Sequence, residues 1–141
     1  MNFDKEYLQA TWNQNLEKTE LISEYFYDIL FHEYEGTEDL FEKTEMHFQK
    51  MEFQKAINHI INNLGDTVKL EQYLKESGIR HVCYGITPIY YNVVEVSLQK
   101  TFEKVFQDIW TDDTKKQWKL LITYILDTMK KGAEEVRSDL E

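Results

Sequence analysis

The sequence is poor in the residues that interrupt helices or cross-link small folds. It contains one proline, five glycines and one cysteine in 141 residues. A single cysteine, Cys83, excludes an internal disulfide and indicates a reducing compartment. The scarcity of proline and glycine argues against a fold with many tight turns, such as a β-sandwich or β-barrel, and favours long helices.

Long hydrophobic runs and a basic surplus are also missing. No apolar stretch approaches the ~18 residues that a membrane-spanning helix needs. The first residues, from Met1 to Glu6, lack the basic region and apolar run of a secretory signal. The formal net charge of −10 argues against a nucleic-acid partner, because phosphates would repel such a surface. We therefore expect a cytoplasmic protein with no membrane or nucleic-acid partner.

The chain does contain enough apolar material for one folded domain. Hydrophobic residues make up 42% of the sequence and aromatic residues 14%, which is more than a disordered chain carries. Apolar residues recur at helical spacing in six to eight segments, and one segment is especially regular: Met46, Gln49, Phe53, Ile57, Ile60, Ile61 and Leu64. These patterns predict an all-α domain over residues 1–132. Gly132 is expected to end the last helix, and residues 133–141 form a charged tail.

Capping residues suggest where the helices begin. After a first helix over residues 4–18, Thr19 is expected to cap the second helix. Gly65 is expected to close the regular segment as a left-handed cap, and Asp66-Thr67 to start the next helix. Thr87-Pro88 opens a long helix, and Thr111-Asp112-Asp113 begins the last one.

One histidine stands at the end of an apolar helical face. Four residues at steps of four, three and four share this face: Leu70, Leu74, Ser77 and His81. Gly85 and the Thr87-Pro88 pair then break the helix. Such an imidazole can be a partnered core histidine or a metal ligand, and the residues taken alone favour the core histidine.

The residues that follow resemble a known haem-binding segment. The run Arg80-His81-Val82-Cys83-Tyr84-Gly85-Ile86, followed by Pro88, Tyr90-Tyr91 and Val93-Val94, is similar to the proximal segment of globins. It is most similar to single-domain bacterial globins, the globin part of flavohaemoglobins and neuroglobin-like globins. The resemblance extends from Phe3 to Met129. It implies a globin fold, three helices over three around haem b, with His81 as the iron ligand.

The same resemblance implies four residues on the distal side of the haem. Phe41 would pack on the haem face; as an alternative it is an ordinary core aromatic. Tyr27 would lie above the iron; as an alternative its hydroxyl caps a backbone carbonyl. Gln49 and Phe53 would form the distal roof. In flavohaemoglobins a tyrosine and a glutamine hold bound oxygen.

The register of the helix with Gln49 depends on which residues it buries. Placing His47 at the distal position would bring Glu52 and Lys55 to the buried face. Placing Phe48 there would put Glu52 over the haem. The Gln49 register keeps three isoleucines inside, namely Ile57, Ile60 and Ile61. We therefore prefer Gln49.

On the proximal side, we expect His81 to donate its second ring proton to the backbone carbonyl of Ser77, one turn back. The resemblance implies that the residues lining this side are Leu74, Ser77, Ile86, Tyr91 and Val94. Four residues depart from the family's habit. Ser77 stands where leucine is usual, and Glu95 where a small residue is common. Glu52 stands where a basic side chain often meets a haem propionate, and Phe53 replaces the usual leucine or valine. The glutamate that partners the proximal histidine of flavohaemoglobins has only uncertain counterparts here, Glu134 and Glu135.

The resemblance implies a haem protein that binds oxygen or another small gas such as nitric oxide. With a distal tyrosine and glutamine, slow oxygen release is expected, which suits nitric oxide dioxygenase or peroxidase-like chemistry. Because the chain shows no flavin or nicotinamide domain, such chemistry would need an external reductase. The alternatives are a haem-based gas sensor or oxygen carrier that signals to a partner, and a helical interaction module without haem.

Overall fold

The structure, a computed structural model, describes residues 2–83 and 88–140, and every element in them is helical. The α-helices are α1 (Lys5–Asn13), α2 (Leu16–Thr19), α3 (Ile22–Glu33), α4 (Met46–Asn62), α5 (Thr67–Cys83), α6 (Pro88–Phe106) and α7 (Asp112–Leu140). Two short 3-10 turns are η1 (Glu38–Phe41) and η2 (Gln107–Ile109). The all-α prediction is confirmed. None of the helices within the described ranges is both long and apolar enough to cross a bilayer.

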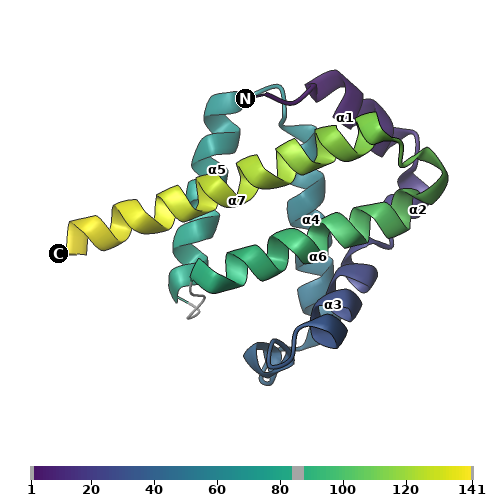
Figure 1. Cartoon of the computed structure of the whole chain (residues 1–141). Coiled ribbons are helices and arrows are strands. Elements are labelled where there is room, and N and C mark those ends of the chain that lie inside the picture. Colours follow the sequence, from purple (N-terminus) through teal and green to yellow (C-terminus); the bar gives the residue numbers. More distant parts are fainter. Residues whose placement is uncertain (1, 84–87, 141) are drawn as a thin grey trace.

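The helices pack as two layers of three. Helices α3, α6 and α7 form one layer, in which α6 contacts both neighbours, and α1, α4 and α5 form the other. Figure 1 shows α6 and α7 running side by side across α4 and α5. The expected three-over-three globin arrangement is therefore the one observed.

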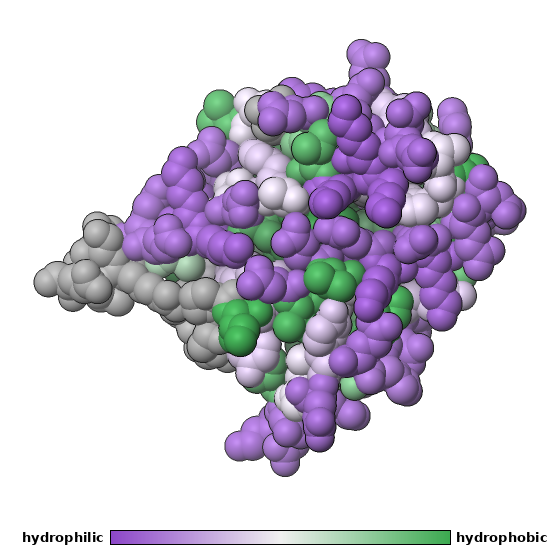
Figure 2. Space-filling model, viewed as in Figure 1, coloured by the Kyte–Doolittle hydropathy of each residue, from purple (hydrophilic) through white to green (hydrophobic). Residues whose placement is uncertain are grey.

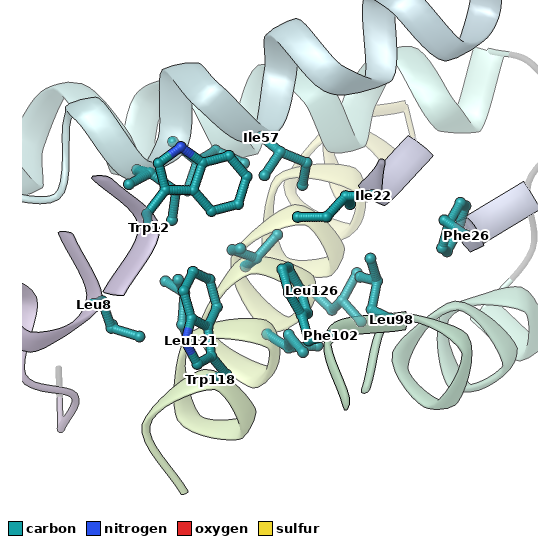
Figure 3. Packing of buried hydrophobic residues seen from close by; sticks show 14 of the residues in the cluster. Leu8, Trp12, Ile22, Phe26, Ile57, Leu98, Phe102, Trp118, Leu121 and Leu126 are labelled. Atoms are coloured by element: carbon teal, nitrogen blue, oxygen red, sulfur yellow. The ribbon is translucent and has the colours of Figure 1, made fainter. Parts of the chain in front are cut away.

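Tryptophan and phenylalanine rings hold α1, α6 and α7 together in the core (Figure 3). The Trp118 ring of α7 lies 4.6 Å from Phe102, 5.4 Å from Phe106 and 6.0 Å from Trp12, between ring centroids. Trp118 is 1% exposed. Such ring contacts add to the stabilisation that comes from removing the rings from water.

Two helix starts agree with the predicted caps, and one does not. Asp66 caps α5 by accepting a hydrogen bond from the Lys69 N–H at 3.1 Å, and Thr111 Oγ1 accepts one from the Thr114 N–H at 3.3 Å. The prediction for Thr19 is wrong: it ends α2, and its buried hydroxyl donates to the Leu16 carbonyl. The first predicted helix is accordingly broken between α1 and α2.

Both glycines expected to end helices behave differently. Gly36, and not Gly65, has the left-handed φ of +90°, so the left-handed cap predicted at Gly65 is wrong. The helix end predicted at Gly132 is also wrong, because α7 continues through it to Leu140. Gly132 lies against the backbone of Lys75 on α5. Residue 132 is glycine because the backbone of α5 comes close to it. The residues after Gly132 continue α7.

Candidate functional site

Two cavities meet at His81. The larger has a volume of about 430 Å³ and lies between α3, η1, α4 and α6; the smaller has about 140 Å³ and lies between α4, α5, α6 and α7. Both are lined by the same four residues where they join: Phe53, His81, Tyr90 and Val94. The result is one predominantly apolar cleft with a single imidazole in its wall.

The His81 ring is oriented by its own helix. Its Nδ1 lies 2.6 Å from the carbonyl oxygen of Ser77, one turn earlier in α5. A carbonyl only accepts hydrogen bonds, so Nδ1 carries the proton and Nε2 of the neutral ring keeps its lone pair. The predicted hydrogen bond to Ser77 is confirmed. A fixed tautomer with a free lone pair is what a metal-binding imidazole requires.

Tyr27 and Gln49 are joined by a hydrogen bond in the larger cavity. The Gln49 Nε2 donates to the Tyr27 hydroxyl oxygen over 2.9 Å. His47 and Phe48 are exposed, Phe48 by 60%, while Ile57, Ile60 and Ile61 are buried. Of the three residues of α4 considered for the distal position, Gln49 is therefore the one that lines the cavity, as preferred from the sequence.

The surroundings keep the Tyr27 phenol in its neutral form. Tyr27 is 3% exposed, and burial raises the pKa of its hydroxyl to about 12, against a smaller lowering by the Gln49 hydrogen bond. Because the oxygen accepts from Gln49, the phenolic proton is available as a donor toward the cavity. The arrangement can stabilise a polar molecule or partial negative charge there.

An aromatic cluster packs around this phenol. The Tyr27 ring centroid lies 5.5 Å from those of Phe41 and Phe53, both edge-on, and Phe26 stacks on Phe53 at 4.6 Å. These contacts restrict the rings to one packing, so the phenol is held at the cavity by its neighbours.

Most of the predicted site residues line the cleft. Tyr27, Phe41 and Gln49 line the larger cavity, Ser77 and Tyr91 the smaller, and Phe53, His81 and Val94 both. Leu74 is 1% exposed and packs in the core, but it lines neither cavity. Ile86 lies outside the described residues.

Several lining residues were not predicted. Tyr90 lines both cavities, Val93 the larger one, and Tyr73 the smaller one. A further three come from α7, namely Ile125, Leu126 and Met129. Tyr90 and Val93 belong to the segment that resembles globins, and this resemblance could have identified them as lining residues. The three α7 residues belong to the apolar face of their helix. The sequence pattern does not indicate which part of the fold that face contacts.

Three glutamates singled out in the sequence, Glu52, Glu95 and Glu135, bond to other side chains and line neither cavity. Glu95 accepts a hydrogen bond from the Thr123 hydroxyl of α7 at 3.2 Å, and Glu52 is exposed and pairs with Lys55 at 3.4 Å. Glu135 pairs with Lys75, with 3.2 Å between the carboxylate and the ammonium nitrogen. Carboxylates at these positions therefore do not place negative charge beside His81.

Fold and site together define a helical protein with an apolar cleft between one imidazole and one tyrosine–glutamine pair. The model of the globin family matches residues 24–129, and the chain belongs to the globin family. The fold is also that of a hexacoordinated heme protein from an anhydrobiotic tardigrade, whose crystal structure superposes with a TM-score of 0.84. The two sequences are 18% identical, and the match covers 93% of each chain. A search of curated proteins found no match.

Haem is the family's cofactor, and the residues of the cleft fit it. His81 lines both cavities, and its Nε2 lone pair is left for a metal because Nδ1 makes the bond to Ser77, as an axial haem ligand requires. Aromatic and aliphatic side chains supply the walls on both sides of that nitrogen. The particular likeness to single-domain bacterial globins and flavohaemoglobins stays a prediction.

Proposed function

We propose that the chain binds haem b through His81 and retains oxygen by hydrogen bonds from Tyr27 and Gln49 on the opposite side. One observation carries this proposal: Gln49 donates to the Tyr27 oxygen at 2.9 Å. That bond orients the phenol and leaves its proton for a ligand. Haem, when bound, supplies an iron that takes diatomic gases and makes dioxygen a polar hydrogen-bond acceptor.

Each residue of the cleft has a separate task in this proposal. His81 would hold the iron through Nε2, with its ring fixed by the Ser77 carbonyl. Phe41, Phe53 and Val94 would pack against the haem and keep water from the ligand. Tyr27 would donate the first hydrogen bond to oxygen, and Gln49 would support the phenol and add a weaker donor.

Slow oxygen release suits the conversion of nitric oxide to nitrate, or a peroxidase-like activity, better than oxygen transport. Either activity would draw electrons from a separate reductase in the cytoplasm. A sensor or carrier has no need to retain oxygen so tightly, and the rate of oxygen release therefore separates these functions.

The test is the dissociation rate of oxygen and of carbon monoxide, measured by stopped flow. A hydrogen bond to a strongly polar acceptor contributes roughly 1.5–3 kcal/mol. Tyr27→Phe should therefore speed oxygen release by about 10- to 150-fold, since each 1.4 kcal/mol is about a factor of ten. Bound carbon monoxide is much less polar, so its release should change far less. Gln49→Leu should change oxygen release in the same direction by a smaller factor.

The matched control is Tyr73→Phe, which removes a hydroxyl from a tyrosine that lines the smaller cavity and not the larger one beside Tyr27. Oxygen release in this variant should equal that of the parent. Equal acceleration for the two gases in Tyr27→Phe would indicate altered packing instead of a lost hydrogen bond. No change for either gas would remove Tyr27 from the site.

A further inference from the structure

The helix that carries His81 crosses α7 at two glycines. A Cβ atom on Gly78 of α5 would lie 1.9 Å from the carbonyl oxygen of Met129, and one on Gly132 of α7 would lie 2.4 Å from that of Lys75. Each glycine faces the backbone of the other helix. In each helix the two residues concerned are three apart, so both contacts belong to one crossing, which is visible in Figure 1.

Glycine is required at both positions by this close approach. Inside a helix glycine is less favourable than alanine, so two buried helical glycines in contact with backbone need a reason. Non-bonded carbon and oxygen atoms keep at least ~3.3 Å apart. A methyl group on either glycine would therefore force the helices apart locally, by roughly 1 Å or more. The obstructing atoms are backbone atoms, so no side-chain rotation can relieve the contact.

The crossing adjoins the groups that define the proximal side of the cleft. Gly78 follows Ser77, whose carbonyl fixes the His81 ring, and it precedes His81 by three residues. Met129 meets Gly78 through its backbone and also lines the smaller cavity beside His81. The distance between α5 and α7 therefore sets where the imidazole stands relative to the cavity wall.

We infer that the Gly78–Gly132 crossing is the positioning element that sets the place of His81, and with it the bond from the imidazole to haem iron. This inference rests on the proposed function, since it takes His81 as the haem ligand. Gly78 and Gly132 are positioning residues: they act through α5 and do not touch the cavity.

The ion pairs of Lys75, one of which joins α5 to α7, do not account for the close crossing. The Lys75 ammonium nitrogen lies 3.4 Å from a Glu71 carboxylate oxygen in α5 and 3.2 Å from one of Glu135 in α7. Both glutamates are about half exposed, and ion pairs at such sites contribute little. Lys75→Met keeps the backbone contact and removes the charges, which makes it a direct control.

The experiment compares Gly78→Ala and Gly132→Ala with the parent. Two controls are Lys75→Met and Gly65→Ala, the latter because nothing lies within 4 Å of a Cβ atom there. Three quantities are measured: the melting temperature of the protein without haem, the rate of haem loss, and the iron–histidine stretching frequency of the ferrous haem form by resonance Raman spectroscopy.

We expect the crossing variants to melt about 4–10 °C lower, since the added methyl overpacks the interface. Their haem loss should be at least ~10-fold faster, and their iron–histidine frequency should shift. Both controls should keep the parent's frequency. If Gly78→Ala does not fold, the inference is tested with Gly132→Ala, where the added Cβ would be farther from the opposing backbone.

Three results would overturn the inference. The first is a crossing variant that melts at or above the parent's temperature, as expected of alanine in an unobstructed helix. The second is an unchanged iron–histidine frequency in a folded crossing variant. The third is an equal shift in Lys75→Met. A parent protein that binds no haem would instead contradict the proposed function, and the melting temperatures would still report on the crossing.

Discussion

At Tyr27, burial and one hydrogen bond act on the same hydroxyl in opposite directions, and burial prevails. The pKa of Tyr27 is raised from 10.0 to about 12. Between these values the unfolded chain loses the phenolic proton while the folded chain keeps it. The stability linked to this proton is therefore complete below pH 10 and is lost as the pH rises through 12.

This shift predicts a pH dependence that belongs to one side chain. Between pH 10 and pH 12 the free energy of unfolding should fall by about 2–3 kcal/mol more in the parent than in Tyr27→Phe. Urea unfolding at a series of pH values measures both proteins, and other titrating groups cancel in the comparison. Parallel pH profiles for the two proteins would show that Tyr27 is not buried as the structure has it.

Single residues could be predicted from the sequence where helical periodicity decides which face they share. The bond from His81 to Ser77 and the inward position of Gln49 both follow from spacing within one helix. Tyr90 and Met129 could not be placed in this way. Their position at the cleft depends on how α6 and α7 pack on α5, which the pattern within a single helix does not contain.

At the scale of one helix, the cap of α5 offers a test that is independent of haem. Asp66 accepts a hydrogen bond from the Lys69 N–H at the start of this helix. Asp66→Ala should lower the free energy of unfolding by about 1 kcal/mol, the usual cost of losing such a cap. Asp66→Asn keeps an acceptor and should cost less. Denaturant unfolding of the apoprotein measures both, and equal losses would show that the hydrogen bond contributes nothing.

The register of α4 predicts the coordination of iron in the resting ferrous protein. Gln49 faces the cavity and is a poor iron ligand, while His47 is exposed and Lys50 is bound to Glu24 at 3.1 Å. The unliganded ferrous form should therefore be five-coordinate and high-spin by absorption and resonance Raman spectroscopy. A six-coordinate spectrum that disappears in His47→Leu or Lys50→Met would contradict this register.

Where a helix ends can depend on contacts with residues far away in the sequence, which local capping patterns do not contain. Asp66 and Thr111 could be recognised as caps because the cap and its helix are neighbours in sequence. Gly132 was expected to end α7 by the same local rule, but its reason lies on α5, 57 positions away at Lys75. Where a distant backbone comes close, tertiary packing decides, and glycine then continues the helix.

At the scale of the whole molecule, the buried hydrophobic residues of the described ranges form one core. The face in Figure 2 is mainly hydrophilic, with small apolar patches. Periodicity and short connections predict several helices around one core, but many arrangements of such helices bury the same residues. The choice of three helices over three came from the globin resemblance, and the structure and the family match agree with it.

The most direct test of the account is the haem coordination of the parent protein and of His81→Ala, followed by visible absorption after reconstitution with haem. The parent should bind one haem per chain. His81→Ala should lose tightly held haem, or recover it with added imidazole, while His32→Ala, at an exposed histidine paired with Asp28, should match the parent. Iron coordination that is unchanged in His81→Ala would contradict the central claim that this imidazole holds the haem.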